Sequence, residues 1–82
     1  MQINLIQGEF SAADTAALIE QMLQIKIRFH EKKISVNSSE EDIKSRETKI
    51  KRLQEELANF RRQMFQSESS YHLEAICNLY KR

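Results

Sequence analysis

The sequence has no proline and no tryptophan, and only one glycine and one cysteine among its 82 residues. Proline and glycine interrupt helices most often, so their scarcity favours long helices. A single cysteine excludes a disulfide within the chain, and with two histidines it leaves too few ligands for a closed zinc site without acidic side chains or a second subunit. Because small domains without disulfides or metals often gain buried surface by self-association, we expect an oligomer.

An excess of one charge is also lacking, because 13 Lys and Arg residues oppose 12 Asp and Glu residues. A net charge of +1 argues against strong, sequence-independent binding to nucleic acid. No hydrophobic run approaches the ~20 residues that cross a membrane, and the start lacks the basic segment and cleavage site of a secretory signal. We therefore expect a cytoplasmic protein without membrane contact, whose thiol stays reduced.

The strongest pattern lies between Ser39 and Gln66. Large hydrophobic residues recur there at spacings of seven, three, four, three and four, at Ile43, Ile50, Leu53, Leu57, Phe60 and Met64. This spacing predicts a helix with one narrow, coiled-coil-like seam, in which Arg46 occupies the missing position. Arg46 would extend to solvent or pair with a carboxylate across an interface. The helix would be capped either by Ser38 with Glu41 or by Ser39 with Asp42.

A second helix is predicted from Ala12 to about Ile34, capped by Ser11 with Asp14. It carries two hydrophobic stripes. The first consists of Leu18, Met22, Ile25 and Phe29, and the second of Ala16, Ile19, Leu23, Ile27, His30 and Ile34. One stripe suffices for the seam of the neighbouring helix, so we expect the second to be covered by another copy of the chain. Residues 35–38 form a connection short enough for an antiparallel hairpin.

Both ends of the chain alternate hydrophobic and polar residues. Residues 1–7 predict a strand that ends at Gly8, with Met1, Ile3 and Leu5 on one side and Ile6 on the other. Residues 71–80 fit a strand, and the alternative is a short third helix with Leu73, Ile76, Cys77 and Tyr80 on one face. The expected fold is mainly α: one domain, residues 1–82, in β-α-α-β order, with an antiparallel, coiled-coil-like helical hairpin between two paired strands. We expect oligomerisation to assemble these hairpins into a multi-helix bundle.

Candidate chemical groups are few. His30 lies on a hydrophobic stripe and is expected to be an interior histidine, not a metal ligand or base. In a strand, His72 and Glu74 share one face while Cys77 points to the other, so these three cannot converge on a metal. The acids Glu40, Glu41 and Asp42 suit the positive end of a helix. We expect no enzymatic activity, no metal and no cofactor.

The favoured function is a protein-interaction or scaffolding module that forms a homodimer or tetramer. Another protein is the second candidate to cover its hydrophobic stripes. The predicted interface comprises Leu18, Ile19, Met22, Leu23, Ile25, Ile27, Phe29, Ile34, Ile43, Ile50, Leu53, Leu57, Phe60 and Met64. The alternative function is a nucleic-acid-binding regulator in which dimerisation brings Lys44, Lys51 and Arg62 of two subunits together.

Overall fold

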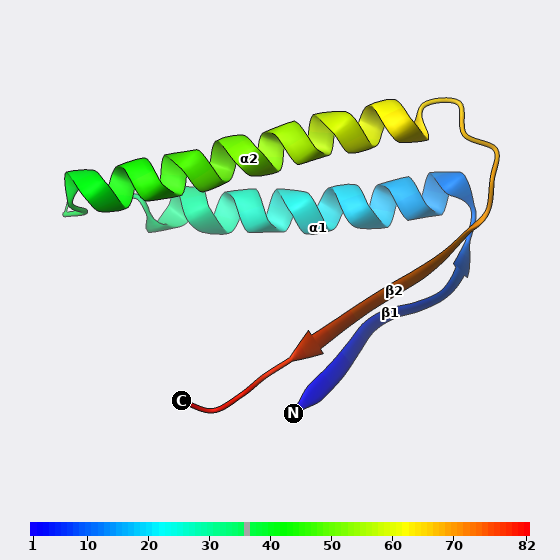
Figure 1. Ribbon diagram of the computed structural model, residues 1–82, viewed down its shortest axis with the longest axis horizontal. Coiled ribbons are helices and arrows are strands. Elements are labelled where there is room, and N and C mark those ends of the chain that lie inside the picture. The colour runs from blue at the N-terminus through cyan, green and yellow to red at the C-terminus, as the bar shows by residue number, and fades with distance from the viewer. Residues whose placement is uncertain (36) are drawn as a thin grey trace.

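The computed structural model describes residues 1–35 and 37–82 and confirms the β-α-α-β order. The elements are β1 (Gln2–Phe10), α1 (Ala12–Lys33), α2 (Glu40–Met64) and β2 (Tyr71–Asn78). The helices form a hairpin, and α1 lies between α2 and the two-stranded sheet (Figure 1). The sheet meets the helices only near the start of α1, and from there the sheet and the hairpin diverge (Figure 1).

Serine side chains cap the N-termini of both helices, as the sequence predicts. The Ser11 Oγ accepts a hydrogen bond from the Asp14 amide at 3.1 Å, and the Ser39 Oγ accepts one from the Asp42 amide at 3.1 Å. Of the two caps predicted for α2, the structure uses Ser39. Ser38 instead accepts from the Ser35 amide at 3.1 Å and donates to the Lys33 carbonyl at 3.4 Å. Of the predicted connection, residue 36 lies outside the described residues.

The hydrophobic core lies between the two helices. Its buried members are Ile27 of α1 and Leu53 and Leu57 of α2, which are 5–7% exposed. The rest of the predicted α2 seam is half-buried, at Ile43, Ile50, Phe60 and Met64. A single layer of side chains therefore holds the hairpin together, as expected for so short a chain.

The stripe of α1 that packs on α2 is the one that we expected another copy to cover. Every residue of the second stripe, from Ala16 to Ile34, is buried or half-buried, whereas Ile25 and Phe29 of the first are exposed. The expectation was wrong because the two stripes differ in length. The second stripe extends for about 27 Å along the helix and the first for about 16 Å. Since hydrophobic stabilisation grows with buried area, the longer stripe takes the intramolecular contact.

The two strands pair antiparallel, and β1 is longer than predicted. Gly8 was expected to end the strand, but pairing continues through Phe10, which lies opposite Tyr71. Gly8 has a φ of 147° and faces Leu73 across the sheet. Glycine adopts this backbone conformation without steric cost and still pairs, so here it shapes the strand and does not terminate it.

A β-bulge at Leu5 changes which residues of β1 share a face. Ile3 lies opposite Cys77 and Ile6 opposite Ala75, with a register shift between Asn4 and Ile6. Because opposite residues point to the same side of a sheet, Ile3 and Ile6 share a face. Simple alternation had placed them on opposite faces and was wrong, because the extra residue in the bulge reverses the phase of the strand.

The last segment is a strand and not a third helix. Its residues alternate between half-buried and exposed, and the half-buried ones are Tyr71, Leu73, Ala75 and Cys77. The strand is favoured because these side chains match the hydrophobic residues of β1 across the sheet, whereas a lone third helix would have no such partner. Beyond the strand, Met1 and Leu79 exchange two backbone hydrogen bonds of 3.0 and 2.8 Å, which extend the pairing.

Candidate interaction surface

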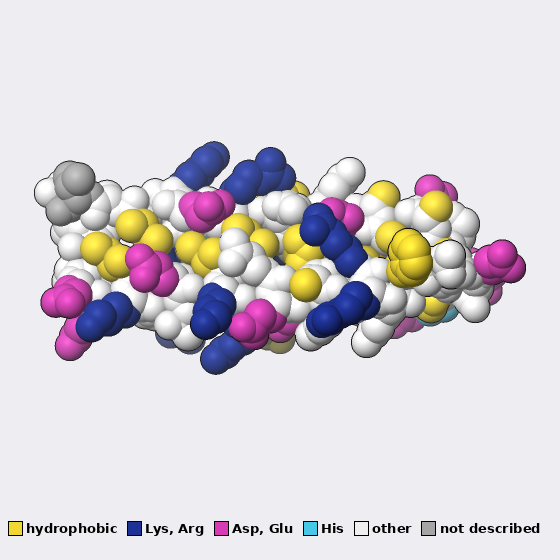
Figure 2. Space-filling model, turned by 90° about the horizontal axis from the view of Figure 1, so that it is seen from above, with side chains coloured by type: hydrophobic (Ala, Val, Ile, Leu, Met, Phe, Trp, Pro, Cys, Tyr) yellow, Lys and Arg dark blue, Asp and Glu magenta, His cyan; other side chains and the backbone are white. Residues whose placement is uncertain are grey.

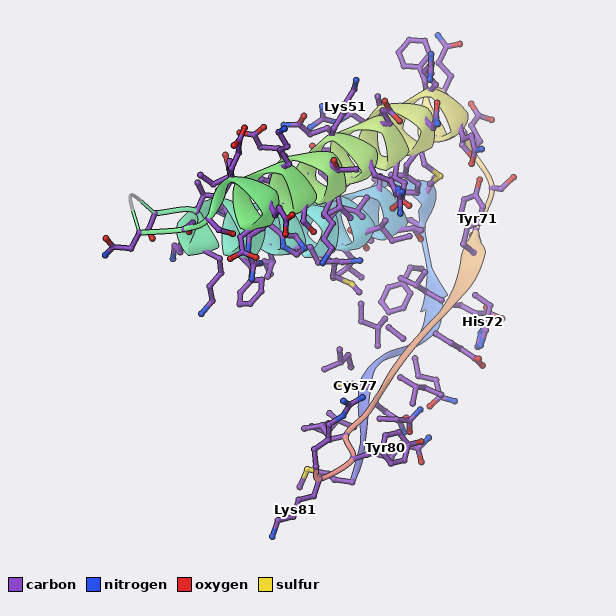
Figure 3. The ribbon with its side chains drawn as sticks, turned by 60° about the vertical axis from the view of Figure 1, so that its left-hand side comes forward. Lys51, Tyr71, His72, Cys77, Tyr80 and Lys81 are labelled. Carbon is purple, nitrogen blue, oxygen red and sulfur yellow. The ribbon has the colours of Figure 1, made fainter. Side chains whose placement is uncertain are left out.

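One face of the sheet and one side of α1 carry hydrophobic side chains toward the same space. The labelled side chains of His72 and Tyr80 project away from the helices (Figure 3), so the alternate residues face the helical side. The sheet lies on the side of α1 away from α2 (Figure 1), and helical spacing places the first stripe about 130° around α1 from the stripe that packs on α2. We call these residues together the inner surface: Met1, Ile3, Ile6, Phe10, Leu73, Ala75, Cys77 and Leu79 of the sheet, and Leu18, Met22, Ile25 and Phe29 of α1.

Much of the inner surface is open to solvent. Ile3 is 41% exposed, Ile25 60% and Phe29 53%. Ile25 and Phe29 also line a hollow of about 360 Å³ together with Arg28 and Lys32. Isolated exposed hydrophobic residues are common, but several within one concave arrangement indicate a site of contact with another macromolecule.

The accessible surface area and the radius of gyration of the chain are both larger than those of a compact monomer, which agrees with an uncovered surface. A compact monomer of this mass, 9.7 kDa, exposes about 5,100 Å². This chain exposes 6930 Å², about 1,800 Å² more. Its radius of gyration is 15.6 Å, against about 12 Å for a compact domain of 82 residues. The excess area is of the size that stable protein partners bury between them.

The predicted interface residues divide into three groups. Ile27, Leu53 and Leu57 form the core within one chain, and Ile25 and Phe29 are exposed. The others are half-buried: Leu18, Ile19, Met22, Leu23, Ile34, Ile43, Ile50, Phe60 and Met64. The sequence also predicts that the uncovered face and edges of the sheet pair with a second subunit, but the predicted interface names none of the sheet's residues. The signal for these residues was the alternation at both ends of the chain, which the bulge at Leu5 obscured.

The outer side of the helical hairpin is different in character. From above, hydrophobic side chains form a narrow line between acidic and basic side chains (Figure 2). The two helices are also joined by an ion pair between Arg61 of α2 and Glu20 of α1, with the Arg61 Nε donating to Glu20 Oε1 at 3.1 Å. Among the described residues, the exposed large hydrophobic side chains include five of the inner surface, Met1, Ile3, Ile25, Phe29 and Leu79, and none of the predicted α2 seam.

Arg46 reaches from α2 toward α1 and contacts His30. Its Nη1 donates a hydrogen bond to the His30 Nδ1 at 3.0 Å, and its guanidinium carbon lies 5.9 Å from the centre of the Phe29 ring. Since the Nδ1 accepts this hydrogen bond, the imidazole is neutral with its proton on Nε2. Desolvation by partial burial, followed by the nearby charges of Arg46, Lys49 and Lys26, lowers the pKa of His30 below its usual value. Whether Arg46 also sets register across an interface stays a prediction.

The lowered pKa of His30 predicts a loss of stability in mild acid. Below the ordinary value near 6.5, the unfolded chain binds a proton that the folded chain resists, so the free energy of unfolding falls as the pH drops toward the folded-state pKa. Urea unfolding at pH 7.5 and 5.5 should show this loss. His30→Gln, which keeps a side-chain acceptor for Arg46, should show less of it. The His72→Gln control retains His30 and should lose stability like the native sequence; an equal loss in His30→Gln would contradict the assignment.

The other candidate groups do not form a cluster. The His72 Nε2 lies 3.0 Å from Glu74 Oε1 on the exposed face of the sheet, and Cys77 points to the other face, as predicted. Among residues 1–35 and 37–82, no group of three or more His, Cys, Asp or Glu side chains is placed to hold a metal ion. Glu40 pairs with Lys44 at 3.5 Å in the first turns of α2.

The basic residues of the alternative function lie on the outer face of α2. Lys44, Lys51 and Arg62 recur at intervals of seven and eleven residues, which places them on one side of the helix. Lys51 points away from α1 (Figure 3). That dimerisation brings these residues together stays a prediction.

The described helices include none that is long and hydrophobic enough to cross a membrane. Comparisons with known protein families, curated proteins and solved structures found no match to this chain.

Proposed function

We propose that the chain is a cytoplasmic, non-enzymatic interaction or scaffolding module that works as a homodimer or tetramer. The observation that carries this proposal is the open inner surface, with Ile3 41%, Ile25 60% and Phe29 53% exposed. A sheet of two strands is marginal in water on its own, and this one has little helix packed against it. A partner that covers the inner surface would supply the missing hydrophobic contact.

A second copy is the simplest partner for this surface. In a two-fold symmetric dimer, the sheet of each chain would pack against the exposed stripe of α1 in the other chain, so the same residues would serve both sides. Burial of most of the excess of about 1,800 Å² per chain would give an interface in the range of obligate dimers.

The edges of the sheet offer a second contact between copies. β1 and β2 are the only strands in residues 1–35 and 37–82, so each has one edge without a strand partner. Unpaired backbone groups at such edges readily accept another strand. Edge pairing between two copies would produce a continuous four-stranded sheet below a four-helix bundle, which combines strand pairing with the covering of the inner surface.

Light scattering coupled to size-exclusion chromatography tests this function. We expect a mass of two or four times 9.7 kDa at micromolar concentration, with a single symmetric peak. A mass of 9.7 kDa at every concentration would contradict the proposal and would leave the inner surface to a different protein.

A further inference from the structure

A second feature, which adjoins the inner surface at Phe29, is a row of cations along one flank of the helical hairpin. Two adjoining cavities of about 310 and 230 Å³ lie on this flank and share Lys49 as a lining residue. Their cationic residues come from both helices. We call them the basic groove: Lys26 and Lys33 of α1, and Arg46, Lys49 and Arg52 of α2.

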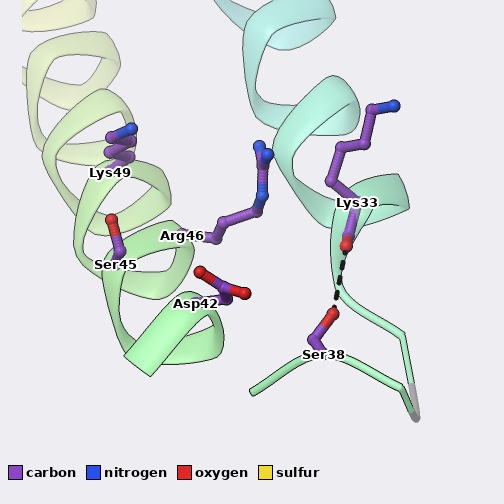
Figure 4. A pocket seen from close by; sticks show the side chains of 6 residues that line it. All are labelled: Lys33, Ser38, Asp42, Ser45, Arg46 and Lys49. Carbon is purple, nitrogen blue, oxygen red and sulfur yellow. Dashed lines mark hydrogen bonds between the residues drawn. The ribbon is translucent and has the colours of Figure 1, made fainter. Parts of the chain in front are cut away.

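The spacing of these residues explains why they line one groove. On α1 the two lysines are seven residues apart, which is about two turns, and on α2 the cations recur every third residue. Arg46 is half-buried near the seam, whereas Lys49 and Arg52 are exposed. Arg46 extends from α2 toward α1, and Lys33 lies across from it (Figure 4). The row on α2 is therefore about 9 Å long, which accommodates more than one small anionic group.

Positive charge in the groove is concentrated and incompletely neutralised. Five cations line it, against the two carboxylates Asp42 and Glu56, although the whole chain has a net charge of only +1. Among the described residues, the ion pairs within 4.0 Å involve none of these five cations. The hydroxyl groups of Ser38 and Ser45 also line the larger cavity and can donate hydrogen bonds.

His30 shows the effect of these cations on a neighbouring side chain. It lines the smaller cavity and is contacted by Arg46 at 3.0 Å. Partial burial and the positive charges of Arg46, Lys49 and Lys26 lower its pKa, with no acidic residue contributing in the opposite direction. The groups that face this imidazole from α1 and α2 are thus predominantly cationic, as in sites that receive anions.

We propose that the basic groove binds a ligand with two or more neighbouring phosphate groups. Lys49 and Arg52 contact the phosphates at the open side of the groove, and Arg46, fixed by His30, donates from its floor. Such charge-assisted hydrogen bonds from Arg and Lys are the usual means of phosphate recognition. The phosphates can belong to a free condensed phosphate or to the backbone of a single nucleic-acid strand, because the groove recognises the chemistry that the two share.

Calorimetric titration of the full chain with inorganic tripolyphosphate tests the site. At a low salt concentration of about 20 mM, where screening is weak, we expect saturable binding. The double variant Lys49→Ala/Arg52→Ala should weaken it about tenfold or more, because two charge-assisted contacts are removed. The control Lys44→Ala/Lys51→Ala removes the same charge from the outer face of α2 and should change the affinity by less than about threefold. Circular dichroism should show equal helix content in all three proteins.

The response of His30 adds a readout that general charge attraction would not give. Bound phosphate should raise its pKa, which NMR titration of the imidazole measures with and without tripolyphosphate. Repeating the titration with a short single-stranded oligonucleotide identifies the source of the phosphates: competition for the same residues indicates a nucleic-acid backbone, and binding of tripolyphosphate alone indicates a condensed phosphate. Absence of tripolyphosphate binding, or an equal loss in both double variants, would overturn the proposal.

Discussion

Replacement of Ile25 by glutamate should convert the assembled protein into single chains. Ile25 is 60% exposed on the inner surface, so the isolated chain loses little buried area by the change. Glutamate forms helices at least as well as isoleucine, so α1 itself should be unaffected. In an assembly that covers the inner surface, however, the carboxylate would be buried without a partner, at a cost of several kcal/mol. We expect the mass by light scattering to fall to that of one chain.

The matched control is Ile76→Glu. Ile76 is 52% exposed, similar to Ile25, but it lies on the opposite face of the sheet from Cys77 and Ala75. Its replacement should leave the mass unchanged. If Ile76→Glu dissociated the assembly and Ile25→Glu did not, the outer face of the sheet would be the interface, and the inner surface would lose its proposed role.

Truncation of Leu57 to alanine should destabilise the fold more than any other single truncation of a leucine. Leu57 is 5% exposed, in the thin core between α1 and α2. Removal of a buried leucine side chain costs about 2–5 kcal/mol, and the total stability of a domain of this length is about 4–12 kcal/mol. We therefore expect a large fraction of the stability to be lost in urea unfolding, measured at the same protein concentration as the native sequence.

Phe65→Ala is the control for this truncation. The Phe65→Ala substitution removes a larger side chain than Leu57→Ala does. Phe65, however, is 76% exposed just after the end of α2. Its loss should change the free energy of unfolding by about 0.5 kcal/mol or less, as for most surface substitutions. Equal losses in Leu57→Ala and Phe65→Ala would show that the interhelical core does not determine the stability.

The elements of the fold could be predicted from the sequence because their signals are local. The heptad spacing of α2, the serines at positions 11 and 39, and the alternation in residues 71–78 each depend on a few neighbouring residues. The bulge at Leu5 and the continuation of β1 past Gly8 could not, because they depend on which residue of β2 lies opposite. Register is a property of two strands, and neither strand encodes it alone.

The candidate sites were predictable only in part for the same reason. The two stripes of α1 are visible in the sequence, but which of them packs on α2 depends on the area that the two helices can bury together. The basic groove was missed because Lys26 and Lys33 lie on a different helix from Arg46, Lys49 and Arg52. The basic residues of α2 as a whole spread around the helix, so the three that line the groove do not stand out in the sequence.

Isotope-filtered NMR on a mixture of labelled and unlabelled chains tests the covering of the inner surface most directly. We predict intermolecular NOEs between the methyl groups of Ile25 in one chain and those of Ile3 or Leu79 in another. Ile76, on the outer face, should show none from packing against the helices of a partner. A complete absence of intermolecular NOEs at Ile25 and Ile3, in a sample concentrated enough to contain any assembly, would contradict the account.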